Sequence, residues 1–116
     1  MLTIQWRSAG KDVAHIQVRG PLIGEAASER LRRTLAAAAE EHSRLLVDLS
    51  AVTQIDAVSI AEIARVAATV RWAGGDVCVV AGNEVNERIA AAGFEQAFKL
   101  TADADQALRC LTQDSC

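Results

Sequence analysis

The stretch Leu46-Val-Asp-Leu-Ser-Ala-Val-Thr-Gln-Ile-Asp-Ala-Val-Ser-Ile-Ala-Glu-Ile63 passes from a strand pattern to a helix pattern. Residues 44–49 form an apolar run that only Asp48 interrupts, which is typical of a central strand covered on at least one face. From Ile60 to Gly74-Gly75 apolar residues recur at helical spacing, and the glycine pair supplies a helix stop. Asp56 precedes this run and carries a side chain that N-cap positions prefer. The stretch therefore predicts a buried strand, a turn and an amphipathic helix.

The remaining strand and helix patterns extend this unit in both directions. Residues 2–7 and 13–18 alternate apolar and polar side chains, which predicts an antiparallel hairpin. Residues 76–81 read as another buried strand and 98–100 as a short edge strand, while three further helices are expected at Glu25–Glu41, Glu84–Ala92 and Asp103–Leu111.

This order of elements indicates an α/β fold with a small mixed sheet of four or five strands. Written out, the order is β-β-α-β-α-β-α-(β)-α, and parallel strands would be connected by right-handed crossovers. One domain is expected over 1–116, with a core of about 2–111 and a short C-terminal tail. Pro21 is expected to mark a turn, and Trp72 to cover the core at a helix end.

Composition narrows the class of protein. Hydrophobic residues make up 51% of the 116 residues and charged ones 23%, as in an ordinary folded domain, and the net charge of −3 argues against nucleic-acid binding. No apolar run is long enough for a membrane span, and no export signal pattern is present. The three cysteines lack CxxC spacing, so neither a disulfide framework nor a zinc site is expected. These observations favour a cytoplasmic protein.

No arrangement of residues predicts catalysis. Asp48 and Asp56 lack an accompanying nucleophile–base pair, and His15 and His42 have no ligands at metal spacing. Gly74-Gly75 precedes a strand rather than a helix, so it does not form a phosphate-binding loop. We therefore expect a protein that is not an enzyme and holds no metal and no cofactor.

The quoted stretch resembles the signature of the STAS family, which includes bacterial anti-sigma factor antagonists. That signature runs apolar-Asp-apolar-Ser-x-Val-x-x-apolar-Asp-Ser-Ser-Gly-Leu. The positions that match are Asp48, Ser50, Val52, Ile55, Asp56 and Ile60. Val18-Arg-Gly-Pro-Leu22, Ala73-Gly-Gly and the pattern Val85…Ile89…Gly93-Phe94 are also similar to the family.

The resemblance implies a small mixed sheet with helices packed mainly on one face, and a function in partner switching. In that mechanism, a kinase that is also an anti-sigma factor binds the antagonist and phosphorylates the serine before the signature glycine. The phosphorylated antagonist then dissociates from the kinase. Here the family's Ser-Ser-Gly becomes Ala57-Val58-Ser59, so the acceptor position holds a valine. Ser59 has a hydroxyl one position later, about 100° further around the helix, and is a possible phosphorylation site only if the helix start is exposed.

The expected partner-binding surface comprises the 50–59 turn, the start of the following helix and the neighbouring 83–86 segment. The partner would resemble an anti-sigma factor with serine kinase activity or another switch protein, and the chain itself would be a monomer or weak homodimer. Two alternatives remain, a STAS subunit of a lipid-transporting ABC-type complex and a scaffold subunit of a sensory assembly. For Asp48, docking and hydrogen bonding to the following turn are equally compatible with the sequence. The predicted surface residues are Asp48, Ser50, Thr53, Asp56, Ala57, Val58, Ser59 and Asn83.

Overall fold

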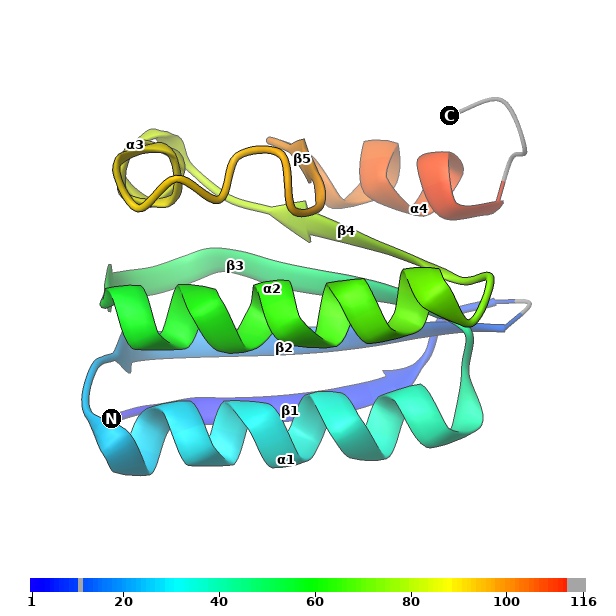
Figure 1. Ribbon diagram of the computed structural model, residues 1–116, viewed down its shortest axis with the longest axis horizontal. Coiled ribbons are helices and arrows are strands. Elements are labelled where there is room, and N and C mark those ends of the chain that lie inside the picture. The colour runs from blue at the N-terminus through cyan, green and yellow to red at the C-terminus, as the bar shows by residue number, and fades with distance from the viewer. Residues whose placement is uncertain (11, 113–116) are drawn as a thin grey trace.

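A five-stranded mixed sheet and four helices make up the fold in the computed structural model, which describes residues 1–10 and 12–112 (Figure 1). The strands lie in chain order across the sheet. β1 runs antiparallel to β2, and β2, β3, β4 and β5 are mutually parallel. The strands are β1 (Thr3–Ser8), β2 (Val13–Leu22), β3 (Arg44–Ile55), β4 (Asp76–Val80) and β5 (Lys99–Thr101); the helices are α1 (Glu25–Glu41), α2 (Ala57–Trp72), α3 (Asn83–Ala91) and α4 (Ala104–Thr112).

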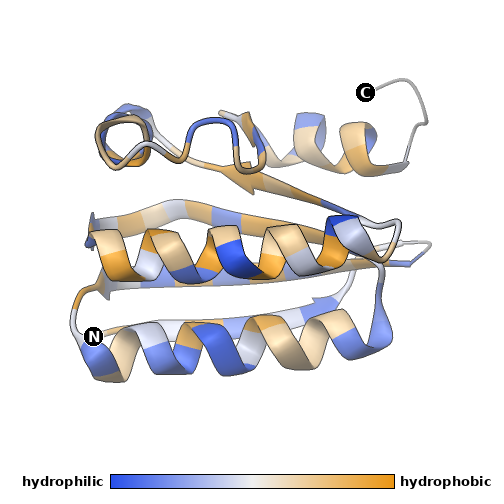
Figure 2. Ribbon diagram, in the orientation of Figure 1, coloured by the Kyte–Doolittle hydropathy of each residue, from blue (hydrophilic) through white to orange (hydrophobic). Residues whose placement is uncertain are grey.

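The two faces of the sheet are covered unequally. α1, α2 and α3 pack their buried residues on one face, where the main core includes Leu31, Ile63 and Ile89. α4 lies on the other face, where Ala107 and Leu111 pack against Leu46, Cys78 and neighbouring side chains. The apolar β4 between these two cores is almost wholly hydrophobic in Figure 2. The predicted fold is confirmed, with α4 as the one helix on the second face.

β2 and β3 are longer than their sequence patterns predicted. β3 continues through residues 50–55, which were expected to form a turn, because β2 also continues past Pro21 and pairs with them. The register of β2 against β3 shifts twice, and one shift falls at Pro21. Since proline has no N–H to donate, a bulge is a position in a sheet that can hold it. The prediction of a turn at Pro21 was therefore wrong.

At the amino-terminal ends of β3 and β4, neighbouring segments are held together by close contacts with Ser43. Asp12 accepts a hydrogen bond from the Ser43 N–H at 3.0 Å, and the Asp76 N–H donates to the Ser43 carbonyl at 3.1 Å. A Cβ on Gly75 would lie 1.9 Å from that same carbonyl oxygen. Only glycine therefore lets the α2–β4 connection pass this close to the start of β3.

Several single-residue expectations have clear outcomes. Cys78 is a free cysteine buried in the core. Cys110 is disulfide-bonded, although the cysteine spacing argued against disulfides. Trp72 is 94% exposed instead of covering the core, because it ends α2 on the outward side of the helix. Among the described helices, none is both long and apolar enough to cross a membrane.

Candidate protein-docking face

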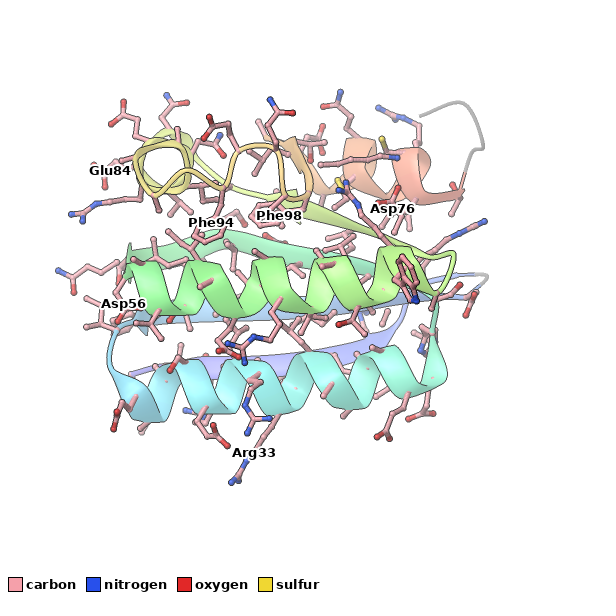
Figure 3. The ribbon with its side chains drawn as sticks, in the orientation of Figure 1. Arg33, Asp56, Asp76, Glu84, Phe94 and Phe98 are labelled. Atoms are coloured by element: carbon pink, nitrogen blue, oxygen red, sulfur yellow. The ribbon has the colours of Figure 1, made fainter. Side chains whose placement is uncertain are left out.

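β2 and β3 end side by side at Leu22 and Ile55, and α3, which follows β4, lies next to them, so that side chains from these segments surround a groove. Because these strands are parallel, Ile23, Asp56 and Glu84 are brought to the same edge, where α/β sheets commonly bind ligands. Figure 3 shows Asp56 and Glu84 at one end of the molecule, with Asp76 toward the other. The groove has a volume of about 430 Å³ and is lined by Ile23, Thr53, Gln54, Ile55, Asp56, Ala57, Glu84, Val85 and Arg88. We call these residues, together with Val58, the docking face.

Asp56 holds the docking face together at the start of α2. One carboxylate oxygen accepts a hydrogen bond from the Ser59 N–H at 2.9 Å, which confirms the predicted N-cap. The other accepts from the Gly24 N–H at 2.9 Å, so the same side chain also fixes the connection between β2 and α1. Partial burial tends to raise the pKa of Asp56, but the hydrogen bonds from Gly24 and Ser59 outweigh it and lower the pKa. The carboxylate is therefore ionised at neutral pH.

Val58 and Ser59 lie on different sides of α2, as the rotation of about 100° between consecutive helix residues predicts. Val58 is 56% exposed on the first turn of α2, whereas Ser59 is 0% exposed. The Ser59 hydroxyl donates a hydrogen bond to the Leu22 carbonyl at 3.2 Å, so it helps to pack α2 against the end of β2. A kinase could reach Ser59 only if this end of α2 opened. Phosphorylation of Ser59 stays a prediction, and this burial argues against it.

Asp48 does not lie with Asp56. It is 7% exposed and accepts hydrogen bonds from the Ser50 N–H at 3.0 Å and the Ser50 hydroxyl at 2.6 Å. Its other oxygen lies 3.5 Å from His15 Nε2, within β2. The Asp48 carboxylate thus makes its contacts within the sheet. This agrees with the alternative in which Asp48 hydrogen-bonds to the segment that follows it, and not with the alternative in which it contacts a partner.

The other predicted residues are divided between the docking face and its border. Thr53 and Ala57 line the groove, and Asn83 is exposed at the first position of α3. Sequence reasoning missed Ile23 and Arg88. Ile23 is an apolar residue next to a strand, a pattern that predicts burial, yet it is 50% exposed because the chain turns at Gly24 immediately after it. Arg88 is a charged residue on a short helix, a pattern that is typical of a solvent-exposed helix face.

No metal-binding cluster accompanies this groove. Across residues 1–10 and 12–112, no group of three or more His, Cys, Asp or Glu side chains is placed to hold a metal ion. The docking face presents the apolar Ile23 and Val58 beside the charged Asp56, Glu84 and Arg88.

The family model for the STAS domain matches residues 9–107, which include β2–β5, α1–α3 and the whole docking face. The chain belongs to the STAS domain family. No match to a curated protein was found.

Solved structures share this STAS fold over nearly the whole chain. An anti-sigma factor antagonist from Mycobacterium paratuberculosis is 24% identical, with 97% of this chain and 96% of that one covered and a TM-score of 0.85. The anti-sigma factor antagonist SpoIIAA of Bacillus, in its unphosphorylated form, is 12% identical over 95% of this chain and 98% of its own, with a TM-score of 0.76. The STAS domain of a SulP transporter from Vibrio cholerae is 19% identical over 90% and 85%, with a TM-score of 0.63. At these identities the likeness establishes the fold.

Proposed function

We propose that this STAS domain is a non-enzymatic regulatory module that binds a protein partner through the docking face, in the manner of an anti-sigma factor antagonist. The observation that carries the proposal is the exposed pair Ile23 and Val58, at 50% and 56%, on the same sheet edge as the groove. The likeness to two anti-sigma factor antagonists supports it. We further propose the cytoplasm as its compartment and a bacterial switch protein with a serine kinase-like ATP-binding fold as its partner.

The docking face has the physical properties that such a contact requires. Val58 and Ile23 provide apolar area that a partner can bury, while Asp56, Glu84 and Arg88 provide a charged border. Asp56 fixes both flanking segments through its two hydrogen bonds, so little ordering is needed on binding. With valine at position 58, the partner would meet an apolar contact where related proteins have the switch hydroxyl.

The test compares two aspartate substitutions at exposed positions of α2. Binding of the purified chain to the ATP-binding switch protein encoded in the same genome would be measured by calorimetry. Val58→Asp places a charge in the docking face but suits a helix N-terminus, so folding should be preserved. We expect it to weaken binding by about 2 kcal/mol, roughly thirtyfold.

The control is Ala68→Asp, which adds the same charge at an exposed position of α2 almost three turns further on. It should leave affinity within about twofold. Equal effects of the two substitutions would remove the docking face from the proposal. Binding instead to the ATPase of a permease complex would favour the transporter alternative, which is prompted by the STAS domain of the SulP transporter.

A further inference from the structure

The two edges of the sheet differ in how they are protected. A free strand edge presents unpaired N–H and C=O groups, and folded proteins usually shorten, charge, bulge or cover such an edge. β5 has only three residues, carries Lys99 and leads directly into α4. β1 has six residues and no proline, and its register against β2 is unbroken, so it contains no bulge. β1 is therefore the less protected of the two edges.

The outer side of β1 pairs with no other strand. Figure 1 shows β1 at the margin of the sheet, with α1 beside it. Arg30 of α1 donates a hydrogen bond to the Leu2 carbonyl at 3.2 Å, just before β1 begins. Across residues 1–10 and 12–112, no hydrogen bond from outside the β1–β2 hairpin reaches the backbone of residues 3–8. The outward backbone groups of β1 are thus left for another strand to pair with.

The two faces of the β1–β2 hairpin have different chemistry. On one face, Ile4 and Trp6 are half-buried and pack against the main core. The other face is uncovered, because α4 packs on β3, β4 and β5 instead. A shallow hollow of about 200 Å³ lies on this uncovered side. We call its six side chains the open face: Thr3, Gln5, Arg7, Gln17 and Arg19, which are exposed, and His15, which is half-buried.

The open face carries positive charge without a compensating carboxylate. Arg7 and Arg19 make no ion pair with any described residue. None of the six residues of the open face is acidic, although the chain as a whole has a net charge of −3. Asp48, the neighbouring acid on β3, is 7% exposed, and its carboxylate contacts His15 and Ser50. The two arginines therefore remain available to an anionic group from outside the chain.

We propose that β1 is a second docking site, which binds an extended segment of a protein partner as a sixth strand. The outward backbone groups of β1 would supply the hydrogen bonds, and the side chains of the added strand would alternate between the two faces. Those on the open face lie beside Arg7, which favours Asp or Glu, and those on the other face lie beside Ile4 and Trp6, which favours apolar residues.

The segment that fits this site alternates acidic and apolar side chains. A second copy of the chain fits less well, because its own arginines at 7 and 19 would add positive charge to the open face and bring no carboxylate. The site goes beyond the docking face, since none of its residues lines the groove there.

The experiment uses a labelled peptide of about eight residues in which glutamate and valine alternate, the length of an ordinary strand. Its binding to the purified chain would be measured by fluorescence anisotropy. The matched control peptide has the same composition with the glutamates and valines in two blocks, and it should bind at least about tenfold more weakly because only the alternating peptide places its carboxylates on one face. Amide hydrogen exchange in β1 should slow when the alternating peptide is bound, since strand addition pairs the outward N–H groups.

Charge reversal on the protein tests the role of the open face. Arg7→Glu should weaken binding of the alternating peptide by at least about tenfold and should strengthen binding of a peptide in which lysine replaces glutamate. Arg7→Gln, which adds no negative charge, should have a smaller effect in the same direction. Arg109→Glu is the control: it makes the same charge change at an exposed position of α4, over the other half of the sheet, and should leave affinity within about twofold.

Three results would each overturn the second docking site. They are no binding of the alternating peptide, equal binding of the block peptide, and slower exchange at the start of α2 without any change in β1. Equal effects of Arg7→Glu and Arg109→Glu would likewise reduce the interaction to net charge. None of these measurements uses the ATP-binding switch protein, so the calorimetry of Val58→Asp decides the docking function independently.

Discussion

Replacing Asp56 with alanine should cost more than the loss of an ordinary helix cap, because its carboxylate joins two segments. Loss of the Ser59 N-cap bond is worth about 1 kcal/mol. The bond from the Gly24 N–H is exposed but accepted by a charged carboxylate, so we take about 1 kcal/mol for it as well. We therefore expect Asp56→Ala to lower the free energy of unfolding by about 2 kcal/mol, equivalent to roughly 8 °C in Tm for a domain of this size.

Urea unfolding of three variants tests this reasoning. Asp56→Asn keeps one acceptor oxygen and should lose about half as much, about 1 kcal/mol. Asp103→Ala is the matched control, since Asp103 accepts one local backbone hydrogen bond at the start of α4, from the Asp105 N–H at 2.8 Å. It should also cost about 1 kcal/mol. If Asp56→Ala costs no more than Asp103→Ala, the link to Gly24 contributes nothing and the argument for a fixed docking face fails.

Two further predictions concern stability. Gly75→Ala should lower the free energy of unfolding by about 3 kcal/mol in denaturant unfolding, since its Cβ would meet the Ser43 carbonyl oxygen at 1.9 Å. Gly82→Ala is the control: a Cβ there would have no atom within 4 Å, so the loss should be under about 1 kcal/mol. Similar losses for the two variants would contradict the close-contact explanation. Acid should destabilise the fold. Burial tends to raise the pKa of Asp76, but the Lys99 ammonium and the Val77 N–H outweigh burial and lower that pKa, and the pKa of Asp56 is lowered too. The stabilisation from these two carboxylates is present above the unfolded pKa of about 3.9 and is lost as the pH falls through their lower pKa values in the folded state. Asp76→Asn should therefore flatten the fall in unfolding free energy below about pH 4. An unchanged slope would refute the contribution of Asp76 to acid sensitivity.

The sequence predicted the fold well where local and tertiary preferences agree. The apolar run at 44–49, the N-cap Asp56 and the helical stripe after Ile60 each specify one structure, and each forms as predicted. The different exposure of Val58 and Ser59 is consistent with the rotation of about 100° between consecutive helix residues. The prediction of a turn at residues 50–55 was wrong. The local sequence, with Ser, Thr and Gln, favours a turn, and only pairing with the far end of β2, which contains Pro21, makes this segment a strand.

The docking face was harder to predict because it depends on exposure, which no local pattern encodes. The apolar side chains of Ile23 and Trp72 favour burial, yet both are exposed because the chain leaves the core at those points. Arg88 enters the groove only because α3, which follows β4, lies beside the end of β3 and the start of α2. Such convergence of distant segments is a property of the sheet topology.

The most exposed aromatic side chain does not mark the docking face. Trp72, at 94%, exceeds Val58 and Ile23 in exposed fraction, but it lies at the far end of α2, roughly 21 Å along the helix axis from Val58. Single exposed apolar residues are common on folded proteins. At the start of α2, two such residues, a groove of about 430 Å³ and a carboxylate that fixes both flanking segments coincide at the edge where parallel strands end. It is this coincidence, and not the exposure of any one side chain, that carries the proposal of partner binding at Val58.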